Sequence, residues 1–285
     1  MKKALVLIVS GMVLITASPI NAEKEGKTNQ ILINYDQPKN PEYQRIYSLL
    51  KDERQTLEKL QEFLSPFRLR WPVEIKLTEC DGEADAWYGD GTITICYEFV
   101  DELWRNMPSE PTAGIEPLDT VVGPFVDTVL HEFAHALFDF IYPPILGREE
   151  DAADQVGALI YLQLDKHDAR RLIMGTVYAY IRETEDTDPP SLEELADEHS
   201  TAEQRRFNLL CMAYGSDPKL YKDVADWAGL PDYRAEICEE EFENIEYAYD
   251  TLIGPHIDKN LAKKVYAKSW LPEEESPMLY QEQTN

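Results

Sequence analysis

The segment that most constrains this chain is an H-E-x-x-H motif, which begins at His131 and ends at His135. It lies within a strongly apolar stretch, residues 121–141, of the kind that forms a buried helix. Residues four apart share one face of a helix, so both imidazoles can reach one metal ion, with Glu132 beside them as a general base. Burying such groups is costly unless they are paired or bind a metal. The motif predicts a zinc site; the simpler alternative is a buried cluster of paired side chains.

The third metal ligand has to come from outside this motif, because a catalytic zinc site takes three protein ligands and keeps one position open. The metzincin continuation requires a glycine and a histidine where this sequence has Phe138 and Ile141, which excludes it. The other continuation takes a glutamate from a following helix. Here Pro143 and Pro144 end the first helix, and the acidic run 149–154 begins a second one.

Within that second helix, Glu150 is the preferred ligand. Asp154 lies four residues later on the same helical face, where it can accept the free N–H of a ligating histidine and orient the ring. Glu149 has an alanine at the same offset and therefore lacks this support. The alternative is that these acidic residues only complement the positive end of the helix dipole.

The motif and the acidic residues after it resemble a known pattern. His131, Glu132, His135, Glu150 and Asp154 are similar to the gluzincin signature of thermolysin-like metallopeptidases, H-E-x-x-H followed by E-x-x-x-D. Other segments resemble a bacterial family described as putative metallopeptidases; in chain order they are 86–88, 96–98, 147–155, 197–199, 204–208 and 234–240. The resemblance implies a zincin-like fold and one zinc ion, but it does not supply a substrate.

We therefore expect an α+β fold of zincin-like type. In it, a small antiparallel sheet with an edge hairpin packs on the active-site helices, and a mostly helical lobe follows. The polar, proline-bearing connection at 186–191 divides an active-site lobe, 23–188, from a C-terminal lobe, 189–285. The two lobes can also form one continuous domain.

The periodicity of apolar residues predicts the individual elements. Strands are expected at 31–35, 73–77, 84–88 and 92–97, the last two joined by a hairpin turn. Helices are expected at 41–67, from 98, around the motif, from 149, and at 169–183, 201–214, 219–228 and 239–252. The residues from about 272 onward are expected to be frayed.

Residues 1–22 have the pattern of a secretory signal peptide. Lys2 and Lys3 precede an apolar segment, 4–17, and Ala22 ends a plausible cleavage site. An uncleaved anchor is the alternative. We expect a periplasmic or secreted protein with no stable membrane insertion after cleavage.

The four cysteines agree with export. Cys80 and Cys96 bracket the expected hairpin, and Cys211 and Cys238 bracket a helical stretch. Two local disulfides are the simplest of the three possible connectivities, and an oxidising compartment favours them. A second zinc site is the competing interpretation, but no C-x-x-C pair is present.

The formal net charge of −27 limits the partners. Such a surface repels nucleic acid and anionic lipid, so we expect neither to bind. Solubility alone is a sufficient reason for the acidic composition.

Peptide hydrolysis also requires a donor for the developing oxyanion and a surface that holds the substrate backbone. His199, in a polar loop before a helix, is the first candidate donor, and Arg205 is the next; a surface histidine near a helix cap is the alternative for His199. The strand Ala86-Trp87-Tyr88 is the candidate for pairing with an extended substrate, as a comparable strand does in thermolysin-like enzymes. Asp85 stands where those enzymes have asparagine, and the hairpin can equally be structural.

The sequence thus predicts an exported zinc metallohydrolase, most consistent with a peptidase that acts on a peptide or protein. A zinc-stabilised binding or scaffold module without catalysis is one alternative. A zinc amidase acting on a non-peptide substrate is another.

Overall fold

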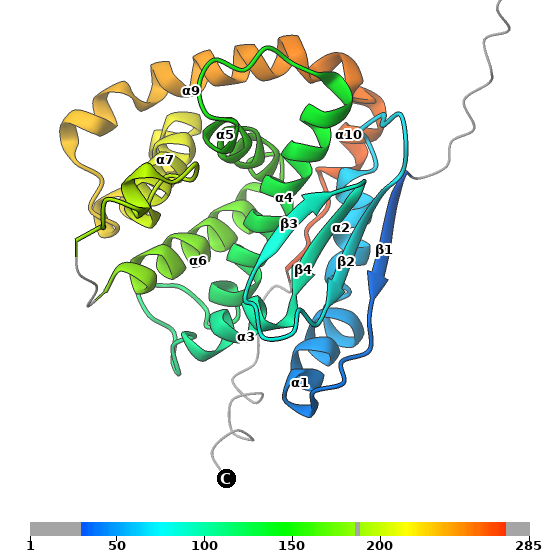
Figure 1. Ribbon diagram of the computed structural model, residues 1–285. Helices are drawn as coiled ribbons and strands as arrows, with labels where there is room; N and C mark the ends of the chain where they lie inside the picture. Colours follow the sequence, from blue (N-terminus) through cyan, green and yellow to red (C-terminus); the bar gives the residue numbers. More distant parts are fainter. Residues whose placement is uncertain (1–29, 186–188, 272–285) are drawn as a thin grey trace, which may run out of the picture.

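The computed structural model describes residues 30–185 and 189–271. In this part of the chain, a four-stranded sheet lies beside a larger group of helices, so the α+β class is confirmed (Figure 1). The predicted signal peptide and the C-terminal residues expected to be frayed lie outside the described residues. None of the described helices combines the length and the apolar character that a membrane span requires.

The sheet is mixed rather than antiparallel, which corrects that detail of the expected fold. It consists of β1 (Ile31–Tyr35), β2 (Val73–Thr78), β3 (Ala86–Gly89) and β4 (Thr92–Cys96), in the spatial order β1-β2-β4-β3. β1, β2 and β4 run parallel, and only β3 and β4 are antiparallel. β3 is therefore an edge strand of the described sheet.

The connections between the strands explain these directions. Helices between β1 and β2 return the chain to the same end of the sheet, as a parallel pair requires. β3 and β4 are joined directly by Asp90 and Gly91, whose φ angles of 49° and 79° form a tight hairpin turn. The hairpin could be predicted from the sequence because both turn residues tolerate positive φ. The helical connection between β1 and β2 has no comparable local pattern, so the parallel direction could not be predicted.

The region 41–67, expected as one helix, is broken. It contains η1 (Pro41–Tyr43), α1 (Gln44–Tyr47), the π-helical turn η2 (Ser48–Glu53) and α2 (Thr56–Leu64). Gln55 lies between the last two with a left-handed φ of 51°. The Tyr35 hydroxyl accepts a hydrogen bond from the backbone N–H of Leu57 at 2.8 Å, which anchors the start of α2 to β1. η2 and α2, on either side of the break, both bury apolar residues. The apolar periodicity of the sequence therefore could not reveal the break.

Helix α4 (Asp119–Ile141) carries the H-E-x-x-H motif through the middle of the protein (Figure 1). It contacts β3 and β4 as well as α3 (Tyr97–Arg105), α5 (Glu149–Tyr161) and α6 (Lys166–Thr184). Gly123 and Gly175 permit the close contact with α6, since a Cβ on either would come within 2.3 or 2.0 Å of the facing backbone. The motif is thus held between the sheet and the helical layer.

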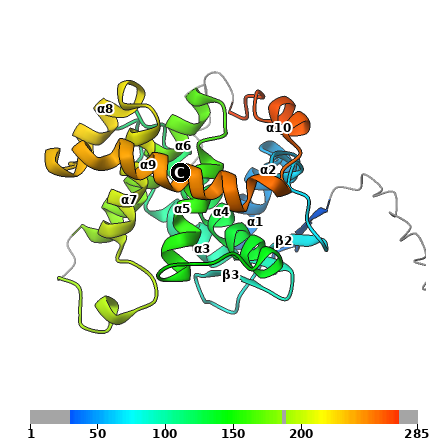
Figure 2. The same ribbon diagram turned by 90° about the horizontal axis from the view of Figure 1, so that it is seen from above.

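The C-terminal part of the described chain is helical, as expected. Its elements are η3 (Glu194–Ala196), α7 (Ala202–Ser216), α8 (Pro218–Trp227), α9 (Asp232–Leu252), η4 (Gly254–His256) and α10 (Lys259–Val265). α7 packs against α5 and α6, and α9 lies across α7 and α5 (Figure 1, Figure 2). α10, which the sequence pattern did not predict, contacts α2. One buried core extends from Ile31 to Val265, across the expected boundary between the lobes.

Both expected disulfides are present. Cys80–Cys96 joins the segment after β2 to the end of β4, and Cys211–Cys238 joins α7 to α9. Because the four sulfurs are bonded in these two pairs, they do not form the second zinc site that was the competing interpretation.

Candidate metal centre

Three side chains from two helices converge at one point. The Nε2 atoms of His131 and His135, one turn apart on α4, lie 3.2 Å from each other. The Oε2 atom of Glu150, in the first turn of α5, lies 3.0 Å from the first of these nitrogens and 3.2 Å from the second. The structure therefore brings the three sequence-predicted ligands together as a group whose atoms could hold a single metal ion.

The spacing and chemistry of these atoms fit zinc. Tetrahedral coordination with bonds of about 2.1 Å places neighbouring ligand atoms about 3.4 Å apart. The three separations in this group, 3.0, 3.2 and 3.2 Å, are only a few tenths of an ångström shorter. Two imidazole nitrogens and one carboxylate oxygen also form a donor set of catalytic zinc sites, which keep a further position open.

The Nδ1 atoms of both histidines are held by carboxylates. Nδ1 of His131 lies 2.8 Å from Asp154 Oδ1, and Nδ1 of His135 lies 3.0 Å from Glu149 Oε1. Such contacts favour the tautomer with the proton on Nδ1, which leaves the Nε2 lone pair facing the centre. The sequence did not indicate the contact between Glu149 and His135, because helical periodicity relates residues along α5 and not across to α4.

Electrostatic coupling around His131 is strong. Burial by itself would lower the pKa of His131, but the carboxylates of Asp154 and Glu150 outweigh burial and raise that pKa to about 9. The hydrogen bond with His131 in turn lowers the pKa of Glu150 to about 2. Burial would raise the pKa of Asp154, yet contacts with His131 and Arg205 lower it to about 2. The acidic groups are thus held as anions that can face a cation.

Glu132 follows the first histidine and lies beside the three converging atoms. Its Oε1 atom is 4.0 Å from His131 Nε2, and its side chain also lines an open cleft. Burial raises the pKa of Glu132, against the opposing effect of the two histidines. A carboxylate with a raised pKa beside an open site can accept and return a proton near neutral pH.

His199 approaches the same centre from the loop before α7. Its Nε2 atom lies 2.9 Å from Glu150 Oε2, and its ring is 6.1 Å from that of His131 between centroids. On its other side, Nδ1 lies 3.2 Å from Asp197 Oδ1. The side chain remains 46% exposed, so it is open to a molecule in the cleft.

Hydrogen bonds among Arg148, Asp151 and Ser200 hold this loop against the start of α5. Arg148 donates two hydrogen bonds of 2.9 Å to Asp151, and it also donates to Ser200 Oγ at 2.6 Å. Ser200 Oγ donates to Asp151 at 2.7 Å. These hydrogen bonds place His199 near Glu150, although the two residues are far apart in the sequence. No sequence spacing predicted this contact.

An open cleft of about 640 Å³ borders the centre. Ala86, Trp87 and Tyr88 of the edge strand β3 line one part of it, together with Glu132 and His135 from α4. Other residues that line it are Asp85, Phe138, Asp139, Tyr142, Pro143, Ile145, Glu149, Glu150, Glu198 and His199. The candidate substrate strand therefore shares one cavity with two of the three candidate ligands, His135 and Glu150.

Two side chains near the strand have contacts that the sequence did not indicate. The Tyr88 hydroxyl donates a hydrogen bond to Asp139 at 2.9 Å, which ties β3 to α4 beside the cleft. Asp85 Oδ1 accepts a hydrogen bond from the backbone N–H of Ala86 at 2.8 Å. The Asp85 side chain is thus engaged with the backbone of the neighbouring residue.

Arg205, the second candidate for an oxyanion donor, lies away from the cleft. Its guanidinium group pairs with Asp154 behind the candidate metal centre, through contacts of 3.0 Å from Nε and 2.7 Å from a terminal nitrogen. It is not among the residues that line the cleft. The structure therefore corrects that expectation, and Arg205 belongs to the support of the centre.

An H-E-x-x-H helix beside an open cleft in an α+β fold is consistent with a metallopeptidase. Residues 35–253 match the model of a family described as putative metallopeptidase, and the chain belongs to this family. Membership implies a metal, for which the His131, His135 and Glu150 group is the candidate site. Neither a curated protein nor a solved structure matches the chain.

Proposed function

We propose that the protein is an exported zinc-dependent peptidase of the gluzincin type, periplasmic or secreted. His131, His135 and Glu150 bind one zinc ion, and Asp154 orients His131. The observation that carries the proposal is the convergence of the three donor atoms within 3.0–3.2 Å beside an open cleft. A bound zinc ion would polarise the scissile carbonyl and lower the pKa of a water molecule.

Glu132 and His199 supply the proton chemistry. Glu132 takes a proton from the attacking water and passes it to the leaving amine, for which its raised pKa is suited. His199 donates a hydrogen bond to the developing oxyanion; its position beside Glu150 and its partial exposure support this role.

The edge strand holds the substrate. Ala86, Trp87 and Tyr88 line the cleft, and β4 pairs with only one side of β3, so an extended peptide can add to the other side. Main-chain hydrogen bonds of this kind bind peptides of varied sequence. This feature favours a peptide or protein substrate over a non-peptide amide.

The test is metal content and turnover of the mature protein, with Glu150→Ala beside Glu149→Ala. Near-stoichiometric zinc that is lost in Glu150→Ala and largely kept in Glu149→Ala is expected. No zinc in wild-type protein, before or after zinc is added back, would overturn the proposal.

One observation favours a second candidate, a zinc-stabilised binding module. His199 Nε2 lies 2.9 Å from Glu150 Oε2, outside the group of three residues whose ligand atoms converge. A small shift of this side chain would complete a set of four protein ligands, which is typical of a structural site. His199→Ala separates the two candidates. The peptidase keeps its zinc and loses turnover, whereas the closed structural site loses zinc affinity and stability together.

A further inference from the structure

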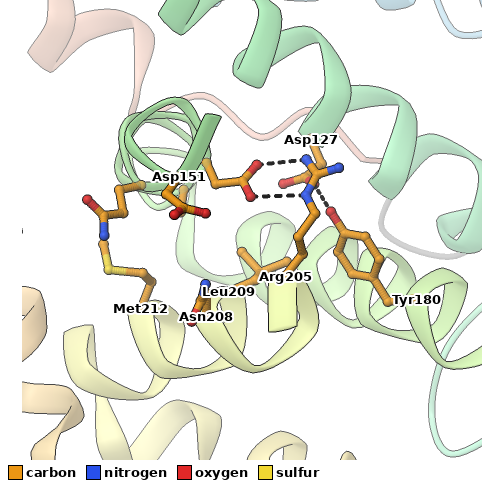
Figure 3. Close-up of a pocket in the computed structure, with 10 residues that line it drawn as sticks. Asp127, Asp151, Tyr180, Arg205, Asn208, Leu209 and Met212 are labelled. Atoms are coloured by element: carbon orange, nitrogen blue, oxygen red, sulfur yellow. Dashed lines mark hydrogen bonds and ion pairs between the residues drawn. The ribbon is translucent and has the colours of Figure 1, made fainter. Parts of the chain in front are cut away.

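A charged network lies behind the candidate metal centre and connects four helices. It contains Asp127 from α4, Asp154 from α5, Tyr180 from α6 and Arg205 from α7. Figure 3 shows the side chains of Asp127, Tyr180 and Arg205 directed toward one another. Asp154 is the point where this network meets the centre, through its contact with His131. α7 follows the connection at 186–191, so the C-terminal helices contribute to the support of the site.

Arg205 contacts both oxygens of the Asp154 carboxylate. Its Nε donates to Oδ2 at 3.0 Å and its terminal nitrogen to Oδ1 at 2.7 Å, which is a two-point contact between planar groups. Oδ1 also lies 2.8 Å from Nδ1 of His131. Because the guanidinium occupies one edge of the carboxylate, the remaining lone pair of Oδ1 is directed at the histidine.

The guanidinium group itself has little freedom to turn. It lies over the ring of Tyr180 at 5.6 Å, and the Tyr180 hydroxyl donates to Asp127 at 3.3 Å. The cavity that these residues line has a volume of about 20 Å³, comparable with the space of a single water molecule. The side chains of Arg205 and Asp154 are only 22% and 19% exposed. A bulky or differently directed side chain could not be accommodated without rearrangement.

We propose that Arg205 is a positioning residue of the metal centre. It acts through Asp154 on the ring orientation of His131, and thereby on the direction in which His131 Nε2 faces the metal. The inference rests on the proposed zinc site. It assigns a role at that site to a residue of α7, a helix that lies outside the H-E-x-x-H and E-x-x-x-D patterns. A lysine could supply the charge at this position but not the two-point contact, since it binds as a single point charge.

The chain contains a matched control. Arg171 on α6 makes a similar two-point contact with Asp119 at the start of α4, with both distances 2.9 Å. That pair also joins two helices and is largely buried, but it lies three turns of helix before His131. Arg171→Lys therefore reports the cost of weakening a buried arginine–carboxylate pair that has no contact with the centre.

The experiment compares zinc affinity, by competition with a chelator, for wild type, Arg205→Lys, Arg205→Gln and Arg171→Lys. Cobalt-substituted samples give the absorption spectrum of the ligand field. We expect about 10- to 100-fold weaker zinc binding and an altered cobalt spectrum in both Arg205 variants. Arg171→Lys should lose a comparable amount of thermal stability while its zinc affinity and cobalt spectrum stay as in wild type.

The path through Asp154 is tested by a double-mutant cycle. If Arg205 acts through this carboxylate, Arg205→Lys has little further effect on zinc affinity in an Asp154→Asn background. Wild-type affinity and spectrum in both Arg205 variants, or full additivity in the cycle, would overturn the inference. This outcome differs from failure of the proposed function, in which wild type binds zinc but cleaves no peptide. Wild-type protein that binds no zinc would overturn both.

Discussion

Gly157 on α5 faces the backbone of His131 on α4 so closely that a side chain has almost no room. A Cβ on Gly157 would lie 3.2 Å from the backbone nitrogen of His131 and 3.3 Å from the carbonyl carbon of Leu130. Glu150 and Asp154 belong to the same helix as the glycine. Any displacement of α5 therefore moves these two carboxylates away from the histidine that they contact.

Gly157→Ala is expected to lower zinc affinity about tenfold with little change in the free energy of unfolding. The alanine favours the helix by about 1 kcal/mol, which offsets the strain of a contact that requires a shift of a few tenths of an ångström. Chelator competition and thermal unfolding measure the two effects. Gly215→Ala is the control, since its Cβ would meet the carbonyl oxygen of Cys238 at 2.3 Å. It should destabilise the contact between α7 and α9 and leave the zinc affinity of the folded protein unchanged.

Glu132→Gln should retain zinc and lose turnover by a factor of about 10²–10⁴, because the amide cannot accept the proton of the attacking water. Metal analysis and hydrolysis of a peptide mixture measure both quantities on one sample. Glu240→Gln, an exposed position on α9, is the control and should behave as wild type. Retained turnover in Glu132→Gln would exclude this residue as the base.

Zinc affinity should depend on pH in a way that reports the environment of His131. Zinc binds the neutral imidazole, whereas the carboxylates of Asp154 and Glu150 raise the pKa of His131 to about 9. Zinc therefore displaces a proton at neutral pH, and its apparent affinity should rise with pH until about 9. Chelator competition between pH 6.5 and 9.5, corrected for the chelator, measures this slope. A plateau that already begins near 6.5 would show that the two carboxylates do not hold the proton.

The cleft should favour cationic peptides. Asp85, Asp139, Glu149 and Glu198 line it, and no lysine or arginine of the described chain is among its lining residues. We expect a higher kcat/KM for peptides with lysine than for matched peptides with glutamate, and a difference that shrinks as ionic strength rises. Equal rates at low salt would show that the acidic lining does not select the substrate.

Loss of the Cys211–Cys238 disulfide should lower the free energy of unfolding by about 3.5 kcal/mol, the chain-entropy value for its loop. The loop spans 27 residues, compared with 16 for Cys80–Cys96. Paired alanine substitutions, unfolded in urea, compare the two bridges. A larger loss from the shorter loop would show that packing, and not loop length, governs their contribution.

Local chemistry made part of the fold and the site predictable. The H-E-x-x-H helix, the hairpin turn at Asp90 and Gly91 and both disulfides follow from short-range patterns, and the structure contains each of them. The proposed ligand Glu150 could be selected because helical periodicity places Asp154 on its face. The break at Gln55 could not be predicted, since the apolar pattern continues on both sides of it.

The sequence by itself determined which residues could serve a metal: two histidines one helical turn apart and an acidic helix after a proline break. Tertiary structure alone decided how these groups are supported. It directed three strands parallel, brought Glu149 to His135 across two helices, and turned Arg205 toward Asp154 instead of the cleft. The physical reason is that periodicity specifies only the face on which a side chain lies. The partner on the opposite face depends on how distant elements pack, and no local pattern records that packing.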